Sequence, residues 1–395
     1  MFPTQSPPSQ RNTGSYEQVT TAGETVSAFV PLPLPPAQPP LVVDADLGER
    51  LRVAELALAR LETAGEMIPS LDWFVYAFVR KEAVLSSQIE GTQATLVDLL
   101  GLEAGADVQA GEADVEEVCN YLDALKHART QLADPDGLPL SLRLLNQTHA
   151  RLMQGVRGAD KQPGEVRRSQ NWIGGSRPGL AAFVPPPPHR LGGLLSDLEK
   201  YLHGSDALPP LLRAGLAHVQ FETIHPYLDG NGRIGRLLIT LLLEHWQLLS
   251  QPLLYLSLHF KRYRSEYYER LGSVRTRGDW EGWMRFFLDG VASVATEAAN
   301  SARELFALVT EDRQRVLQTS ATSVAALRLF ELLPRHPIVS VAFVVEQLEV
   351  SKPTAGRAIE LLVQVGVLKE TTGRQRDRAW MYWRYLDRLR EGTEL

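Results

Sequence analysis

The stretch HPYLDGNGRIGR, from His225 to Arg236, places a histidine, an aspartate, an asparagine, two arginines and three glycines within twelve residues. Three interpretations are open: a phosphate site, a dinucleotide-binding fingerprint, or a glycine-rich loop between helices. A dinucleotide fingerprint has to follow a β-strand. The segment immediately upstream, LLRAGLAHVQFETI, instead has apolar residues at helical spacing. The stretch is therefore predicted to connect two helices, which argues against dinucleotide binding.

The backbone of this stretch favours an anion site. Pro226 disfavours helical geometry at His225, so the histidine is predicted to end the upstream helix on a fixed backbone. Gly230 and Gly232 allow successive N–H groups to converge. The apolar run that follows predicts a helix, whose N-terminus adds a partial positive charge.

The charged side chains fit a polyphosphate. Arg233 and Arg236 lie three positions apart on the predicted helix and can address one anion from the same side. Asp229 would repel phosphate unless it binds a divalent cation. Histidine titrates near neutral pH and suits a general base. The residues thus predict a nucleotide polyphosphate site beside a histidine base.

The same stretch closely resembles the Fic-domain motif His-Pro-x-x-Asp/Glu-Gly-Asn-Gly-Arg-x-x-Arg, which defines a family of AMP-transferring enzymes. Tyr227 stands where the family usually has phenylalanine, and it keeps an aromatic ring. The resemblance implies a mainly α fold: a Fic-type helical core with a β-hairpin flap, followed by a winged helix-turn-helix. It also implies ATP and Mg²⁺ as cofactors.

The resemblance further implies a role for each side chain of the motif. His225 would take the proton of a target hydroxyl, and Asp229 would bind the magnesium. For Gln220, upstream on the helix, a nucleotide contact and a helix-packing role are both open. The expected ATP-binding residues are Gly230, Asn231, Gly232, Arg233, Arg236 and Gln220.

A second segment, SQNWIGGSRPGLAAFVPPPPHRL, has two strand-like runs around a Gly/Ser/Pro turn and predicts a lone β-hairpin at residues 169–191. It resembles the Fic flap, which implies that an extended target segment docks along it by strand addition. A Ser, Thr or Tyr of a target protein would accept AMP, with self-modification included; a purely structural hairpin is the alternative. The expected docking residues are Trp172, Ile173, Gly174 and Phe183.

A third segment, SSQIEGT, ends an apolar helical pattern and fits Ser/Thr-x-x-x-Glu-Gly/Asn, which resembles the Fic inhibitory helix. The pattern alone is weak, since a chance match in a chain of this length is expected about one time in three. Its position upstream of the motif implies autoinhibition by Glu90, with Ser86 and Gly91 completing the pattern. A solvated glutamate at a helix end is the alternative.

Composition divides the chain further. The proline-rich run FVPLPLPPAQPP, from Phe29 to Pro40, should be extended, either strapped over its own domain or exposed as a PxxP ligand. Residues 321–395 carry 11 Lys/Arg against 9 Asp/Glu, and their pattern of helix, helix and hairpin predicts a winged helix with Gly373 to Arg378 as its wing. DNA binding by this part is open. The expected domains are a disordered tail at 1–28, the arm and inhibitory region at 29–110, the catalytic core at 111–317 and the winged helix at 318–395.

The bulk properties exclude some classes. A net charge of −6 argues against a protein that coats itself in nucleic acid, and the single Cys119 excludes an internal disulfide. No apolar run reaches the length of a membrane span and no leader is apparent, so a cytoplasmic protein is expected. Two alternatives to AMP transfer are open: transfer or removal of another phosphate-containing group, and a nucleotide-sensing DNA-binding regulator. A homo-oligomer is also compatible with the sequence.

Overall fold

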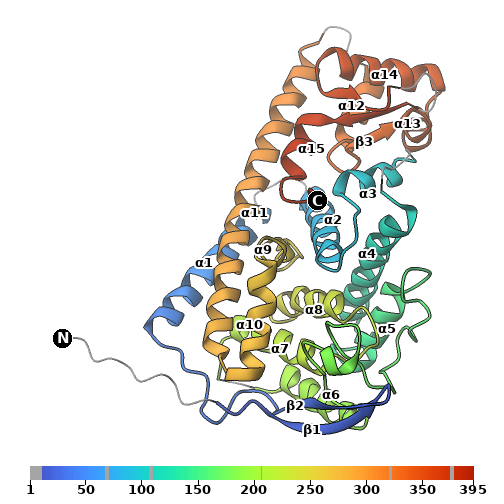
Figure 1. The fold of residues 1–395 in the computed structure, drawn as a ribbon. Coiled ribbons are helices and arrows are strands. Elements are labelled where there is room, and N and C mark those ends of the chain that lie inside the picture. Colours follow the sequence, from blue (N-terminus) through green and yellow to red (C-terminus); the bar gives the residue numbers. More distant parts are fainter. Residues whose placement is uncertain (1–10, 67–70, 106–109, 206, 320–322, 374–377) are drawn as a thin grey trace. The chain divides into compact units, whose positions relative to one another are not determined.

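The computed structural model describes residues 11–66, 71–105, 110–205, 207–319, 323–373 and 378–395. The described chain is mainly helical with small antiparallel sheets, which confirms the expected fold class (Figure 1). It divides into two compact units, and each is assembled from three separate segments of sequence. The first contains Met1–Ala57, Asp123–Leu249 and His259–Ser293; the second contains Leu58–Leu122, Ser250–Leu258 and Val294–Leu395. No described helix is both long and apolar enough to cross a bilayer.

The first unit is built around one buried helix. Every residue of α7 (Pro210–Ile224) from Leu211 onward is buried, polar ones included. Helix α8 (Asn231–His245) packs beside it, and the other helices lie around this pair (Figure 1). They are α5 (Leu142–Leu152), α6 (Pro188–His203) and α10 (Arg264–Arg277), with the short helix η1 (Pro178–Leu180) in the flap segment.

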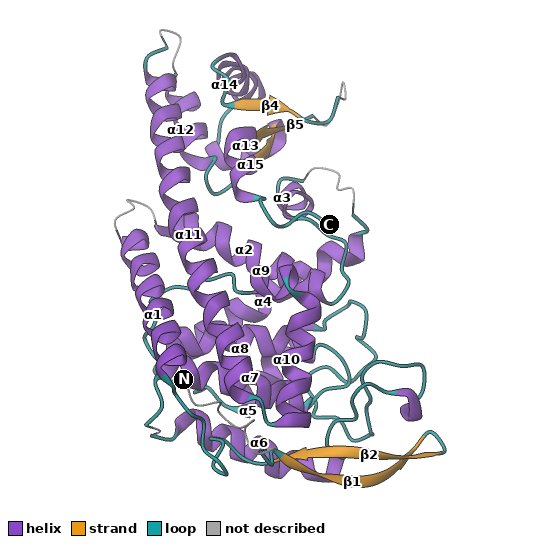
Figure 2. Ribbon diagram, turned by 60° about the vertical axis from the view of Figure 1, so that its left-hand side comes forward, coloured by secondary structure: helices purple, strands orange, loops and turns teal. Residues whose placement is uncertain are grey.

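A long β-hairpin begins the described chain (Figure 2). Strands β1 (Gly14–Thr21) and β2 (Glu24–Pro31) pair antiparallel along their whole length. The expected disordered tail at 1–28 is therefore wrong for residues 14–28, and residues 1–10 lie outside the described chain. The polar alternation of this segment reflects strands with exposed faces, and Ala22 and Gly23, both at positive φ, make the turn.

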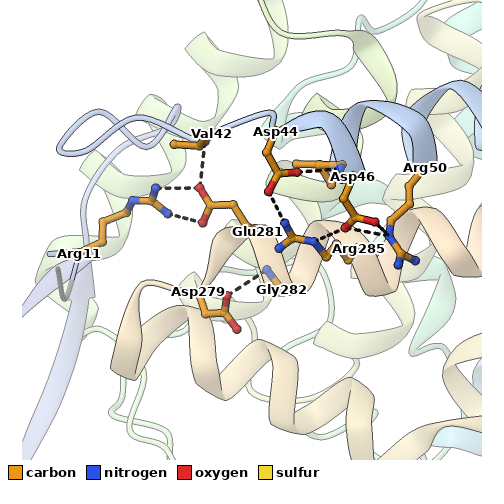
Figure 3. A network of polar contacts seen from close by, with 10 residues as sticks. Arg11, Val42, Asp44, Asp46, Arg50, Asp279, Glu281, Gly282 and Arg285 are labelled. Atoms are coloured by element: carbon orange, nitrogen blue, oxygen red, sulfur yellow. Dashed lines mark hydrogen bonds and ion pairs between the residues drawn. The ribbon is translucent and has the colours of Figure 1, made fainter. Parts of the chain in front are cut away.

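An ionic network attaches the proline-rich arm to the first unit (Figure 3). The Arg11 guanidinium pairs with Glu281 at 2.8 Å and donates to the carbonyls of Pro39 and Pro40. Glu281 also accepts the N–H of Val42 at 2.9 Å. These contacts favour the strapped arm over the exposed ligand. A neighbouring set of ion pairs holds the start of α1 (Ala45–Glu66) to α11 (Trp280–Leu317). It joins Asp44, Asp46, Arg50, Arg285 and Asp289.

The second unit contains the winged helix. It combines the helices α12 (Val324–Leu332), α13 (Val341–Leu348) and α14 (Lys352–Gln364) with a small sheet of order β3-β5-β4. Strand β3 lies between α12 and α13 in the chain, and α15 (Trp383–Leu389) follows the sheet. Its strands are β3 (Ile338–Ser340), β4 (Leu368–Glu370) and β5 (Ala379–Tyr382). This confirms the winged helix, although residues 374–377 of the expected wing lie outside the described chain.

The remaining helices do not divide between the two units at the domain boundaries expected from the sequence. Helices α2 (Leu71–Ile89) and α3 (Leu96–Glu103) belong to the second unit. Helices α1 (Ala45–Glu66), α4 (Glu112–Ala133), α9 (Ser257–Arg262) and α11 (Trp280–Leu317) have residues in both units. The sequence-order boundaries near residues 110 and 317 therefore stay predictions.

Candidate active site

His225 ends α7 in a left-handed conformation. Its φ and ψ are 50° and 62°, and its N–H donates to the Phe221 carbonyl at 2.9 Å. Pro226 excludes helical geometry at the preceding residue, as predicted. A left-handed conformation at a residue with a Cβ costs on the order of 1–3 kcal/mol, so the surrounding contacts have to hold it.

Arg167 supplies these contacts, and it was missed from the sequence. Its side chain is 2% exposed. Nε donates to the His225 carbonyl at 2.9 Å, and Nη1 and Nη2 donate to the carbonyls of Ser169 and Pro186 at 3.1 and 2.6 Å. Burial lowers the pKa of Arg167 to about 10, which leaves it charged at neutral pH. One buried guanidinium thus ties the His225 backbone to both sides of the flap.

Asn231 closes the loop after His225. Its Oδ1 accepts the Tyr227 N–H at 2.8 Å, and its Nδ2 donates to the Tyr227 carbonyl at 2.8 Å. The side chain was expected to contact phosphate, but both its amide atoms bond this backbone. The main-chain N–H groups of Asn231, Gly232 and Arg233 form the first turn of α8, where a helix offers no internal acceptors.

A pair of residues on α5 supports the loop from the other side, and these were also missed. His149 stacks on Tyr227 with ring centroids 3.8 Å apart, and its Nε2 lies 3.0 Å from the Asp229 carbonyl. The Gly164 N–H donates to its Nδ1 at 2.8 Å, so Nε2 carries the proton. Asn146 accepts the Tyr227 hydroxyl at 2.9 Å. Tyr227 therefore has a packing role that phenylalanine could fill only in part.

Two glycines of the motif are required by close packing. Gly230 has φ 74°, and a Cβ there would lie 2.8 Å from Met153 Sδ. A Cβ at Gly235 would lie 2.3 Å from Glu222 Oε1 on α7. Gly235 therefore allows α8 to pack closely against α7. This helix–helix contact accounts for the third glycine of the G-x-G-x-x-G spacing, which here does not belong to a dinucleotide-binding fold.

The two arginines of the motif are buried beside the loop. Arg233 and Arg236 are each 2% exposed. Arg233 Nη2 lies 3.4 Å from Met153 Sδ and 3.9 Å from Asp229 Oδ1. The two guanidinium groups therefore add positive charge to the first turns of α8, where the helix N-terminus already favours an anion.

Asp229 is the residue that fits a metal. Its side chain is 42% exposed, and its Oδ1 accepts the Gly230 N–H at 2.6 Å. Within the described residues, no group of three or more His, Cys, Asp or Glu side chains is arranged to hold an ion. A single exposed carboxylate fits Mg²⁺, which is commonly bound by one or two carboxylates together with substrate phosphates.

The flap is less regular than the predicted hairpin. Residues 169–191 contain one antiparallel bridge, in which Ile173 and Phe183 exchange N–H···O bonds of 2.8 and 3.1 Å, and η1 replaces the expected turn. The Asn171 amide donates to the Leu228 carbonyl at 3.3 Å, which attaches the flap to the motif loop. Trp172 is half-buried and Gly174 is exposed.

The N-terminal β-hairpin braces this flap. The Phe29 N–H donates to the Val184 carbonyl at 2.9 Å. Glu24 accepts from Arg177 at 2.8 Å and from the Gly179 N–H at 3.0 Å. The Arg275 guanidinium lies 3.9 Å from the Phe183 ring centroid, so this expected docking residue already has a cationic partner.

Gln220 also contacts the N-terminal region. Its Nε2 donates to the Leu32 carbonyl at 2.9 Å, and the residue is 4% exposed. Between the two roles left open by the sequence, this bond favours the packing one. A nucleotide contact by Gln220 stays a prediction.

The second motif lies in the second unit. Helix α2 ends at Ile89, and Glu90 occupies the following turn, where its N–H donates to the Ser87 carbonyl at 3.0 Å. Gly91 has φ 101°, which favours glycine, and Ser86 is fully buried. The predicted position of Glu90 at a helix end is confirmed; its pairing with Arg236 stays a prediction.

Comparison with family models assigns the domains. Residues 49–130 match the Fic/DOC family N-terminal region, residues 139–243 match the Fic/DOC family, and residues 327–381 match an HTH DNA binding domain. The chain therefore contains a Fic/DOC-family N-terminal region, a Fic/DOC domain and a C-terminal helix-turn-helix domain.

Among curated proteins, the chain is similar to those named "Protein adenylyltransferase Fic". It is 32% identical over 205 residues to that of Drosophila grimshawi, covering 51% of this chain and 39% of the relative. With that of Aedes aegypti, the identity is 31% over 205 residues, covering 51% and 38%. The chain thus spans about two fifths of the length of these relatives.

Solved structures share the fold. A Fic family protein from Desulfovibrio desulfuricans G20 aligns with a TM-score of 0.55 at 21% identity, covering 87% of this chain and 98% of that one. Fic-1 from C. elegans aligns with a TM-score of 0.51 at 23% identity, covering 68% and 74%.

Proposed function

We propose that this protein is an adenylyltransferase that transfers AMP from ATP to a hydroxyl group of a target protein. One observation carries the proposal: His225 and the N-terminal turn of α8 belong to a single loop, closed by Asn231 and held by Arg167. A histidine base and a phosphate-binding helix terminus are thereby fixed on the same short backbone. The name of the curated relatives supports the same activity.

In the proposed reaction, the acceptor oxygen attacks the α-phosphorus of ATP. The bond from this phosphorus to the oxygen bridging the α- and β-phosphates breaks, pyrophosphate leaves, and the hydroxyl proton moves to His225. Nδ1 of His225 is buried, so the proposal assigns the proton to Nε2. Positioning and charge stabilisation provide most of the rate in phosphoryl-type transfers, so no protein nucleophile is needed.

The phosphates are assigned to the start of α8. The main-chain N–H groups of Asn231, Gly232 and Arg233 would bind the α-phosphate, where charge develops as the bonds change. Arg233 and Arg236 would bind the remaining phosphates. Asp229 would hold Mg²⁺, which when bound neutralises part of the phosphate charge.

The acceptor segment is assigned to the flap edge at Trp172 and Gly174. The bridge with Phe183 uses both main-chain groups of Ile173, so the residues on either side of it are proposed for docking. An extended target segment would add there by main-chain hydrogen bonds. This mode selects for an extended segment carrying a Ser, Thr or Tyr more than for a particular side-chain sequence.

Glu90 is assigned an inhibitory role. Its carboxylate would pair with Arg236 and compete with the terminal phosphate of ATP for the guanidinium. The nucleotide would then bind with its α-phosphate out of line for attack, and such misplacement costs on the order of a hundredfold in rate.

The test is transfer of label from α-labelled ATP with Mg²⁺, to the protein itself or to lysate proteins. His225→Ala should abolish transfer while nucleotide binding persists, because the histidine moves a proton and does not hold phosphate. His245→Ala, an exposed histidine at the other end of α8, is the matched control and should transfer normally. Mass spectrometry of the modified protein identifies the transferred group. A group other than AMP would contradict adenylyl transfer and indicate transfer of a different phosphate-containing group.

We also propose that the winged helix binds DNA, because its family match is a DNA-binding domain. Lys352 and Arg357 are exposed on α14, the helix that would enter the major groove. The full chain should shift duplex DNA with an affinity that falls steeply with salt, and Lys352→Ala with Arg357→Ala should weaken it. Absence of any shift at low salt would reject DNA binding.

A further inference from the structure

The side chain of Gln88 lies within the inhibitory motif, between Ser86 and Glu90, and it bonds two distant backbones. Its Nε2 donates to the Ala94 carbonyl at 2.9 Å and to the Thr393 carbonyl at 2.8 Å. A side-chain amide has two N–H donors, and these two carbonyls match both. The residue therefore joins the end of α2 to a segment about 300 positions away in sequence.

Other contacts hold the opposite side of the same turn. The Thr92 hydroxyl donates to Glu117 on α4 at 2.8 Å, and both residues are at most 2% exposed. The Gln93 N–H donates to Asp114, also on α4, at 2.8 Å. The turn that carries Glu90 is thus fixed by α4 after the glutamate and by Gln88 before it.

The segment around Thr393 has a defined structure. Thr393 is 1% exposed, and its N–H and hydroxyl both donate to the Arg390 carbonyl, at 2.8 and 2.7 Å. Gly392 has φ 82°, and a Cβ there would lie 2.6 Å from Leu258 Cδ1. The Thr393 carbonyl is therefore presented to Gln88 by an ordered turn that directly follows α15.

The winged helix also contacts the beginning of α2. Arg335 pairs with Asp72, and the rings of His336 and Tyr76 meet edge to face with centroids 5.8 Å apart. Both ends of the inhibitory helix therefore contact residues of the C-terminal domain.

We propose that Gln88 and the turn Arg390–Thr393 form a latch that positions Glu90, which makes the winged-helix domain part of the inhibitory device. The proposal rests on the proposed inhibition by Glu90. Releasing the latch removes one hydrogen bond from the turn, and Glu90 then spends less time in its inhibitory position. The latch residues are positioning residues, since they act through Glu90.

The test compares two independent ways of releasing the latch in the full chain. Gln88→Leu removes the donors, and a variant ending at Gly392 removes the Thr393 carbonyl. The variant ending at Gly392 should raise AMP incorporation about fivefold, the equivalent of a single hydrogen bond of about 1 kcal/mol. Gln88→Leu also loses the bond to Ala94 and should raise incorporation by at least as much. The combined variant should gain little over Gln88→Leu, because that change already removes the contact with Thr393. Glu391→Ala, whose side chain is 65% exposed, is the control and should behave as wild type.

A second readout does not depend on activity. Hydrogen exchange of the Glu90, Gly91 and Thr92 amides, which are bonded within the turn, should accelerate in both latch variants and not in Glu391→Ala. If Glu90→Gly raises transfer while both latch variants keep wild-type transfer and exchange, the latch is wrong and the proposed inhibition stands. If Glu90→Gly fails to raise transfer, the proposed inhibition fails, and unchanged amide exchange would then overturn the latch as well.

Discussion

Arg167 shows how one residue can hold an active-site conformation without contacting substrate. All three of its side-chain hydrogen bonds go to main-chain carbonyls, on His225 and on both sides of the flap. No carboxylate in the described part of the chain accepts from it, so its three donors all serve to hold main-chain carbonyls. The left-handed His225 and the flap strands are therefore fixed relative to each other by the same side chain.

We predict that Arg167→Met destabilises the protein by on the order of 3 kcal/mol and lowers AMP transfer, because three carbonyls lose a charged donor. Denaturant unfolding measures the first effect and label transfer the second. Arg168→Met is a close control, since this neighbour is 83% exposed and pairs with Glu165 at the surface. Equal stabilities of the two variants would contradict the role given to Arg167.

His149 makes the stability of the loop depend on pH. Burial lowers its pKa from 6.5 to about 4, and Asp229 and Arg233 are the charged groups facing it. The folded state therefore binds fewer protons than the unfolded state below pH 6.5. The stabilisation, about 3 kcal/mol, is complete above pH 6.5 and is lost as the pH falls towards 4.

We accordingly expect His149→Gln to have a smaller loss of stability between pH 7 and pH 4.5 than wild type. Urea unfolding at several pH values measures this difference. If the free energy of unfolding of His149→Gln depends on pH as that of wild type does, protonation of His149 does not cause the loss of stability at low pH.

At the scale of elements, the flap depends on a hairpin that precedes it by well over a hundred residues. A single bridge gives the flap little stability of its own, because isolated two-stranded structures are marginal in water. The β1–β2 hairpin adds the Phe29–Val184 backbone bond and the two contacts of Glu24.

Glu24→Ala should therefore accelerate hydrogen exchange at the Ile173 and Phe183 amides. It should also lower the rate of AMP transfer to target proteins without changing the affinity for ATP. Gln18→Ala is the matched control, because the Gln18 side chain donates to Ser27 of the same hairpin and not to the flap. Equal exchange rates in the two variants would mean that the hairpin does not brace the flap.

The two helices around His225 and the motif loop could be predicted because local rules decide them. Helical spacing, Pro226 and the glycines all act within a few residues. The hairpin at 14–31 could have been predicted from GSYEQVTTAGETVSAFVP, where β-branched residues flank a turn. Its polar composition was instead interpreted as disorder. Arg167 and His149 could not be predicted, since a buried arginine and a buried histidine have no distinguishing local sequence signal.

At the scale of the whole molecule, the domains expected from the sequence differ from the two compact units of the structure. The Fic match at 139–243 lies within the first unit, while the Glu90 turn and the winged helix belong to the second. Such a division arises from contacts far apart in sequence, as between Gln88 and Thr393. Local patterns cannot reveal it.

The central claim is that His225 is the general base for AMP transfer and that Glu90 inhibits the transfer. The direct measurement is labelled AMP incorporation by wild type, Glu90→Gly, and Glu90→Gly with His225→Ala. We predict a large increase in the single variant, including self-modification, and loss of incorporation in the double variant with its fold intact. Equal or lower incorporation in Glu90→Gly would contradict the inhibitory role, and incorporation that persists in the double variant would contradict His225 as the base.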